Sequence, residues 1–212
     1  MALRKQRTWF RTAALVATIL ATSGYAANSD HVTQLALTKE CERCDLTNID
    51  LTYAALNLAV INFSDLSGSD LSNASVSNAF LEGANLFRAN LQNANFHATD
   101  LVITNFFEAD LSNADFSKTI LRKADLSSAI AVNTDFKTAD FTHAILIDTD
   151  LSGADLSGAD LTSADLEGAN LTGTNLTDAI LSGANIFDTW VLNATLCRTM
   201  TPWGEVNRDC PS

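Results

Sequence analysis

The stretch DLSGADLSGADLTSADLEGANL, residues 150–171, decides the fold of this chain. It repeats every five residues: a small residue, an acid or amide, a leucine, then two small or polar residues. Counted outward from Leu151, the frame holds without a slip from Leu46 to Leu196, which makes 31 consecutive units. Self-similarity over such a length predicts a solenoid built from one repeated element.

The residue choice at each position shows which way it points. We call the central residue of each unit position i. It is Leu, Phe, Ile or Val in every unit except that of Ala131, and position i−2 is Ala, Ser or Thr except at Cys44 and Ile49. Position i−1 is Asp or Asn in 21 of the 31 units. We therefore expect positions i and i−2 to point inward and the other three outward.

A period of five matches neither the 3.6-residue period of a helix nor the alternation of a strand. It fits a square coil with one unit per side, so that four units make a coil of twenty residues. Coils would then pair their backbones at about the inter-strand distance of ~4.8 Å. Residues twenty apart should stack, which places Phe96, Phe116 and Phe136 in one inward column. Ala131 is expected to leave a local void or pinch.

These residues resemble the pentapeptide-repeat family, whose consensus is A(D/N)LXX. The resemblance covers residues 41–197 and implies an all-β solenoid, a right-handed quadrilateral β-helix, with just under eight coils and a length of roughly 37 Å. The ends, TKxCxxCDL before the repeats and LCxTMxxxGxxNxxxC after them, are similar to exported cyanobacterial and thylakoid-lumen members. Pro202-Trp203-Gly204 stands where a Pro-Asp-Gly turn is expected, which leaves that turn's geometry open.

The chain divides into four segments. Residues 1–26 are typical of a Sec-type signal peptide, with a basic start, an apolar core over 12–22 and cleavage expected after Ala26; the alternative is an uncleaved membrane anchor. Residues 27–43 form an N-terminal cap with a short helix over 29–39, started by Ser29 or Asp30. The β-helix occupies 44–197 and a C-terminal cap 198–212. We expect no membrane span after cleavage, and a location in the periplasm or thylakoid lumen.

Four cysteines flank the repeats. Cys41 and Cys44 can form a local structural disulfide, a redox pair or half a metal site, and export favours the structural disulfide. Cys197 and Cys210 bracket the tail and are expected to close the C-terminal cap. Four cysteines allow three pairings, so the sequence leaves the connectivity open.

Catalysis is not indicated. The three histidines, His31, His97 and His143, fall on different units, and no Ser-His-Asp or Cys-His set can be assembled. A rod with a filled core also lacks a natural cleft. We expect no enzymatic activity, no metal and no cofactor.

Charge limits the partners. The chain carries a net −12, and removal of residues 1–26 takes away four basic residues to leave −16, so nucleic acid is not an expected partner. Asp115, Asp135 and Asp155 should stack in one outward column, as a solvated ladder relieved by Asn95 and Asn175 or, alternatively, as a weak divalent-cation site. By resemblance, an acidic rod can also imitate duplex DNA and inhibit a topoisomerase-type enzyme, but the signal peptide argues against this function.

The outer surface carries the strongest functional signal. We number the four faces from the unit of Leu46. Faces two and three are mostly polar, whereas outward positions of face four and of the adjoining face one are apolar. A contiguous apolar patch indicates an interface, so we predict a scaffold that binds an unidentified protein, in an oligomeric state that the sequence does not fix. The candidate residues are Val60, Phe63, Phe80, Val102, Ile103, Ile120 and Ile180 on face four, and Phe87, Phe107, Ile145, Ile147 and Phe187 on face one.

Overall fold

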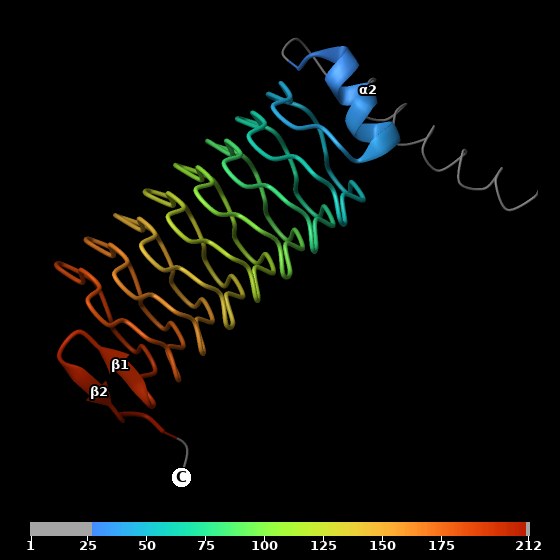
Figure 1. Cartoon of the computed structure of the whole chain (residues 1–212). Helices are drawn as coiled ribbons and strands as arrows, with labels where there is room; N and C mark the ends of the chain where they lie inside the picture. Colours follow the sequence, from blue (N-terminus) through green and yellow to red (C-terminus); the bar gives the residue numbers. More distant parts are fainter. Residues whose placement is uncertain (1–26, 211–212) are drawn as a thin grey trace, which may run out of the picture.

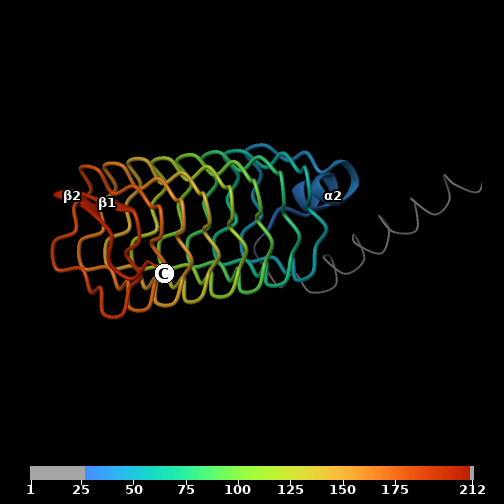
Figure 2. The same cartoon turned by 90° about the horizontal axis from the view of Figure 1, so that it is seen from below.

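The chain forms one rod of stacked coils (Figures 1 and 2). The computed structural model describes residues 27–210. Helix α2 (Ser29–Thr38) lies at one end, and the two-stranded antiparallel sheet of β1 (Thr199–Thr201) and β2 (Gly204–Val206) lies at the other. The expected signal peptide, 1–26, is outside the described residues. Within 27–210, no helix is long and apolar enough to cross a membrane.

Backbone pairing confirms the twenty-residue coil. Parallel bridges join residues twenty apart along the whole rod, from Glu40 with Val60 to Ile180 with Met200. The hydrogen bonds run both ways between neighbouring coils: Leu71 N donates to Asn90 O at 2.7 Å, and Asn90 N donates to Ser69 O at 3.0 Å. Each side of the square is therefore a ladder of very short parallel strands.

A tight turn follows each central residue and sets the period of five. Leu51 O accepts a hydrogen bond from Ala54 N at 3.0 Å, and Tyr53 at the third position has φ 58°, as in a type II β-turn. The left-handed φ recurs at position i+2 of the units, where Gly and Asn are frequent. These two residues reach this region at the lowest steric cost.

The Asp or Asn at position i−1 fastens the turn that follows it. Asp160 Oδ1 accepts a hydrogen bond from Thr162 N at 2.9 Å, and Asn170 Oδ1 accepts one from Thr172 N at 3.0 Å. Asn side chains also link coils, since Asn170 Nδ2 donates to Asp150 Oδ1 at 3.0 Å. Acids and amides are thus used for turn formation as well as for solubility.

Side chains fill the core of the rod. Positions i and i−2 are buried along most of the rod, as expected. The threonines at i−2 place their hydroxyl hydrogen bonds inside: Thr134 Oγ1 donates to Leu111 O at 2.8 Å, and Thr174 Oγ1 to Leu151 O at 2.8 Å. In the described part of the chain, no buried side-chain nitrogen or oxygen lacks a partner.

The phenylalanine column is confirmed. The rings of Phe96 and Phe116 stack with centroids 4.7 Å apart, and Phe136 follows at 5.5 Å from Phe116 in a tilted arrangement. Two more rings join from other sides: Phe106 meets Phe116 edge-on at 6.0 Å, and Phe141 meets Phe136 edge-on at 5.1 Å. Such geometries are favourable for aromatic pairs beyond the area that they bury.

Helix α2 lies against the first coil. Asn28 begins it, with Oδ1 accepting from Asp30 N at 2.9 Å, so the expected N-cap at Ser29 or Asp30 was wrong by one or two residues. The three residues of its apolar stripe, Val32, Leu35 and Ala36, are buried against the core. Both disulfides expected of the cysteines are present, Cys41 with Cys44 and Cys197 with Cys210.

Candidate functional site

The predicted apolar set lies on two adjoining faces of the rod. Its exposed members are at least a third accessible to solvent: Phe63, Phe80, Ile103, Ile120, Ile145, Ile180 and Phe187. Its half-buried members are Val60, Phe87, Val102, Phe107 and Ile147.

The register divides this set into parts. On face four the i−1 column runs through Val60 and Phe80 to Asp100, then Ile120. Two aspartates, Asp140 and Asp160, separate Ile120 from Ile180, so Ile180 lies apart and pairs with Met200 near β1. We therefore define the face-four patch as the group within neighbouring coils: Val60, Phe63, Phe80, Val102, Ile103 and Ile120.

Apolar residues at i−1 leave the following turn without its usual acceptor. Arg122 N, after Ile120, has no hydrogen-bond partner among residues 27–210, and neither has Ser182 N after Ile180. After Phe80, Glu82 N is instead satisfied by Asn62 Oδ1 of the preceding coil at 2.9 Å. A forgone hydrogen bond of this kind is worth about 0.5–1.5 kcal/mol. Ile120 therefore lacks the turn hydrogen bond that an Asp or Asn at this position would make.

One side of the patch is hollowed and bears cations. A cavity of about 410 Å³ is lined by Glu82, Val102, Ile103, Arg122, Lys123, Thr142 and His143. Arg122 Nε lies 3.7 Å from Asp140 Oδ2, whereas Lys123 has no ion pair among residues 27–210. Ile103 projects from a backbone with φ 52°, a region that β-branched residues rarely occupy. Apolar surface and positive charge thus meet at one place on an acidic rod.

The apolar residues of face one form separate contacts. The rings of Phe87 and Phe107 stack at 6.0 Å, with Arg88 over Phe87 at 4.8 Å and paired with Glu108. Ile145 and Ile147 lie farther along the rod, because Ser127 stands between Phe107 and Ile147 in their column. The structure does not bring the two face-one groups together.

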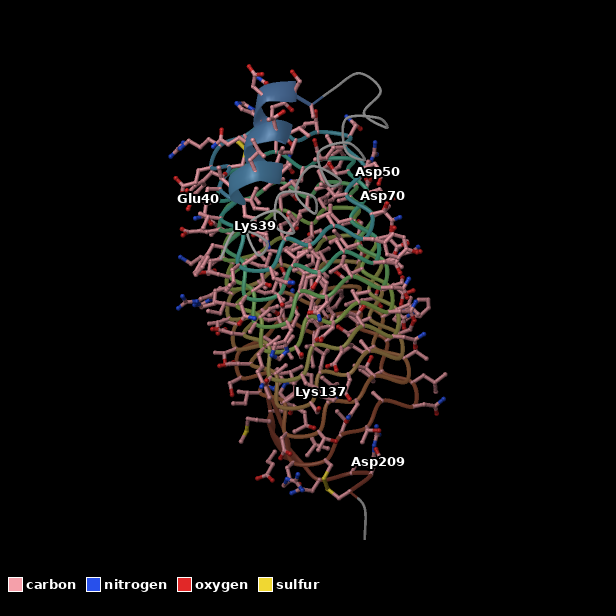
Figure 3. The ribbon with its side chains drawn as sticks, turned by 90° about the vertical axis from the view of Figure 1, so that its right-hand side faces the viewer. Lys39, Glu40, Asp50, Asp70, Lys137 and Asp209 are labelled. Atoms are coloured by element: carbon pink, nitrogen blue, oxygen red, sulfur yellow. A yellow bond between two sulfur atoms is a disulfide. The ribbon has the colours of Figure 1, made fainter. Side chains whose placement is uncertain are left out.

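The acidic column on face three is present. Asp115, Asp135 and Asp155 pair in succession across three coils. Lys137 lies between the last two, with Nζ 3.0 Å from Asp135 Oδ2 and 3.1 Å from Asp155 Oδ2. Figure 3 labels this lysine on the side of the rod. Asn175 Nδ2 adds a hydrogen bond to Asp155 Oδ1 at 3.2 Å, as expected of that neighbour. The twenty-residue period predicts which residues stack but not that Lys137, at position i+1 of the unit of Phe136, reaches this column.

The electrostatics of the column follow from these contacts. Burial raises the pKa of Asp155, but hydrogen bonds from Ser157 and Lys137 outweigh it and hold the pKa below its ordinary value. Hydrogen bonds to Asp135 and Asp155 raise the pKa of Lys137. Among residues 27–210, no group of three or more His, Cys, Asp or Glu side chains is arranged to hold a metal ion.

Comparison with known proteins assigns the family. Eight copies of the family model "Pentapeptide repeats" match residues 40–75, 64–101, 104–122, 120–158 and 154–189, which together cover most of the chain. The chain belongs to the pentapeptide repeat family. Proteins of this family form right-handed quadrilateral β-helices and are generally non-catalytic scaffolds or binders. Among curated proteins, no sequence gives a significant match.

Three proteins of known structure are similar to this chain. HetL from the cyanobacterium Nostoc sp. strain PCC 7120, involved in heterocyst differentiation regulation, is 29% identical over 79% of this chain and 91% of its own, with a TM-score of 0.31. A pentapeptide repeat protein from the Arabidopsis thaliana thylakoid lumen is 30% identical over 56% of this chain and 69% of its own, with a TM-score of 0.21. QnrB1, a plasmid-mediated fluoroquinolone resistance protein, is 20% identical over 80% of this chain and 86% of its own, with a TM-score of 0.31.

Proposed function

We propose that this chain is an exported, non-catalytic scaffold that binds a protein partner through the face-four patch. The observation that carries the proposal is Ile120, an exposed apolar residue at a position where the repeat uses Asp or Asn to fasten the turn. Phe80 and Ile120 lie on the same side, two coils apart, with Ile103 beside them. Exposed apolar residues that gather in one patch are typical of an interface.

The compartment of this scaffold is proposed to be the periplasm or the thylakoid lumen. Residues 1–26 supply the export signal, and two disulfides persist most readily in an oxidising compartment. Helix α2 would cap the first coil and keep its edges from pairing with other chains. Expression of the full chain followed by intact-mass measurement tests export: the exported protein should begin at Ala27.

The binding test uses variants that restore the consensus. Phe80→Asn and Ile120→Asn introduce the side chain that fastens turns elsewhere in the rod, so the double variant should fold at least as stably as the wild type. Ile130→Asn is the matched control, because Ile130 breaks the same rule on face two and is 46% exposed. Mature chain of each form serves as bait in native periplasmic or lumenal extract.

The proposal expects one discrete partner to be captured by the wild type and by Ile130→Asn, and to be lost from the double variant. Retention of that partner by the double variant would show that the patch is a passive surface. A competing proposal, DNA mimicry by the acidic columns, instead expects binding of a topoisomerase-type enzyme that is lost when Asp115, Asp135 and Asp155 become Asn.

A further inference from the structure

One corner of the rod carries positive charge on an otherwise acidic molecule. Residues 27–210 hold all 25 acidic residues of the chain but only nine of its 13 basic residues, a net −16. Two of these nine, Arg122 and Lys123, are consecutive and lie on the turn between faces four and one. They line the cavity of about 410 Å³ beside the face-four patch, here called the corner cavity.

The two cationic side chains of the corner cavity are not used in hydrogen bonds within the chain. Arg122 Nε lies 3.7 Å from Asp140 Oδ2, beyond hydrogen-bond distance. The Lys123 ammonium makes neither an ion pair nor a hydrogen bond among residues 27–210. Arg198, in contrast, donates two hydrogen bonds of 2.6 Å to Asp178. The corner cavity therefore keeps donors of positive charge for another molecule.

A backbone donor is free at the same place. The N–H of Arg122 has no partner among residues 27–210, because Ile120 stands where the repeat uses Asp or Asn. In the next coil, the equivalent N–H of Thr142 donates to Asp140 Oδ1 at 3.0 Å. A carboxylate from another molecule can take the place of this missing oxygen. It would then meet a backbone N–H, a guanidinium and an ammonium, the donors that bind carboxylates most strongly.

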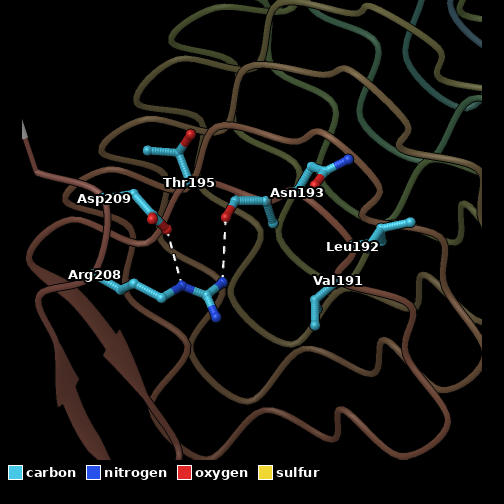
Figure 4. Close-up of a pocket in the computed structure, with 7 residues that line it drawn as sticks. Val191, Leu192, Asn193, Thr195, Arg208 and Asp209 are labelled. Atoms are coloured by element: carbon cyan, nitrogen blue, oxygen red, sulfur yellow. Dashed lines mark hydrogen bonds and ion pairs between the residues drawn. The ribbon is translucent and has the colours of Figure 1, made fainter.

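The hollow beside β1 and β2 lacks such free cations. Residues 191–195 and the pair Arg208–Asp209 line a space of about 680 Å³ (Figure 4). The Arg208 guanidinium is used within the chain, with Nε 2.9 Å from Asp209 Oδ2 and Nη2 3.5 Å from Ala194 O. The positive charge of this larger hollow is thus neutralised, whereas that of the corner cavity is not.

Apolar side chains form the other part of the corner cavity. Val102 and Ile103 line it, and Ile103 is exposed. The exposed residues Phe80 and Ile120 of the face-four patch continue this apolar surface beyond the cavity. Such a surface favours an extended chain, which can place successive side chains along it, over a single small molecule.

Charge also limits how many acids the occupant can carry. Arg122 and Lys123 attract one carboxylate, but Glu82 lines the same cavity and the acids of faces two and three repel further negative charge. A polyanion such as nucleic acid is therefore disfavoured. We propose that the corner cavity binds an extended segment of a partner protein, with one Asp or Glu carboxylate held by Arg122 and Lys123 and a neighbouring apolar side chain on the apolar half. This inference rests on the proposed function, because it names the chemistry of the partner.

Selection of a phage-displayed random peptide library on the mature chain tests this inference. Enriched peptides should carry an Asp or Glu beside an apolar residue. The strongest peptide is then labelled with fluorescein and titrated with each protein, both in its acid form and with the acid replaced by its amide. Lys123→Gln should weaken binding of the acid form about tenfold. It should weaken the amide form much less, because both changes remove the same contact.

Lys118→Gln is the matched control. Lys118 occupies the same position of the preceding unit, is exposed and makes no ion pair among residues 27–210, but it does not line the corner cavity. Both variants lose one positive charge from an exposed side chain, so circular dichroism should report an unchanged fold for each. Lys118→Gln should bind the acid peptide like the wild type. Enriched peptides without acids, or equal weakening by the two variants, would overturn the inference.

Ile120→Asn separates this inference from the proposed function. Peptides that Ile120→Asn loses but Lys123→Gln retains would overturn the carboxylate contact and leave the face-four patch as a binding surface. A selection that enriches no peptide also overturns the inference, whereas the capture experiment with native extract still tests the scaffold. A fluorescent oligothymidylate serves as the polyanion probe. Its binding by the wild type and loss in Lys123→Gln would assign the cavity to nucleic acid instead.

Discussion

Gly83 shows how a single position of the repeat joins two coils. Its φ of +63° lies in the left-handed region, and a Cβ built on it would come within 2.5 Å of the Phe63 ring. The ring of Phe63 therefore rests on the backbone of the next coil, with Arg43 over it at 5.2 Å. A glycine here allows a large apolar side chain of the face-four patch to lie flat.

We expect Gly83→Ala to destabilise the fold by more than Gly173→Ala. Both substitutions place a side chain at positive φ, at a cost of about 1–2 kcal/mol. Only at Gly83 must an aromatic ring also move, since at Gly173 the nearest atom to a new Cβ is a backbone nitrogen 4.0 Å away. Urea denaturation of the two variants measures the difference, and equal losses would show that Phe63 is not held by this contact.

For single residues, the sequence predicts which positions of the repeat point inward and which point outward. It does so because Leu and Ala recur at two fixed positions of the five, and polar residues occupy the others. It did not reveal why position i−1 is acidic. That reason lies in hydrogen bonds such as Asp160 to Thr162, which depend on the turn conformation. Once the turn is known, an apolar residue such as Ile120 becomes informative in its own right.

At the scale of one coil, Ala131 and Phe141 complement each other. In a four-sided coil, sides two units apart face each other, so the small Ala131 lies opposite the large Phe141, which also meets Phe136 at 5.1 Å. Ala131 is fully buried. The sequence predicts a void or a pinch at Ala131. In this arrangement the ring of Phe141 can instead occupy the space that a leucine at position 131 would fill.

Ala131→Leu should therefore overpack the coil and destabilise the fold by about 1–3 kcal/mol. The double variant Ala131→Leu/Phe141→Leu should recover part of this loss, because the two side chains share one space. Thermal and urea unfolding give both values. A single variant more stable than the wild type would instead reveal an unfilled void at Ala131.

Asp155 and Lys137 of the acidic column make stability depend on pH. The folded-state pKa of Asp155 lies below its ordinary value, so its carboxylate stabilises the fold above about pH 4 and this contribution is lost as the pH falls through the folded pKa. The pKa of Lys137 is raised, so its contribution is present below about pH 10 and is lost as the pH rises through its folded value.

Lys137→Met should lower stability at pH 7 and make the loss of stability between about pH 5 and pH 2 shallower than in the wild type. The reason is that Asp155 would then lose the partner that depresses its pKa. Lys118→Met is the control, since Lys118 makes no ion pair among residues 27–210. Unfolding free energies measured across this range would contradict the account if both variants followed the wild-type curve.

At the ends of the rod, sequence was a weaker guide. Asn28, Ser29 and Asp30 are all good N-caps, and the choice of Asn28 follows from its contacts: its backbone N–H also donates to Asp45 O of the first coil at 3.2 Å. Val191 keeps the repeat frame and reads as buried. Its exposure follows from the path of the chain after Leu196, where the β1–β2 hairpin continues only the fourth side of the coil, and the frame alone does not show this path.

Across the whole molecule, different surfaces have different properties. Faces two and three hold the ladder of acids and amides, and face four bears the candidate binding patch. A rigid rod keeps these surfaces at fixed separation, which is what a scaffold requires. Charges added to one surface should therefore leave the other unaffected, because positions far apart contribute independently.

The most direct test of the central claim is site-specific photocrosslinking in native extract. A benzophenone amino acid replaces Ile120 in the face-four patch or, in the matched form, Ile130 on face two. The account predicts a discrete crosslinked species from position 120 that is absent from position 130. Identical patterns from both positions, or no crosslink from either, would contradict the claim that this face binds a protein partner.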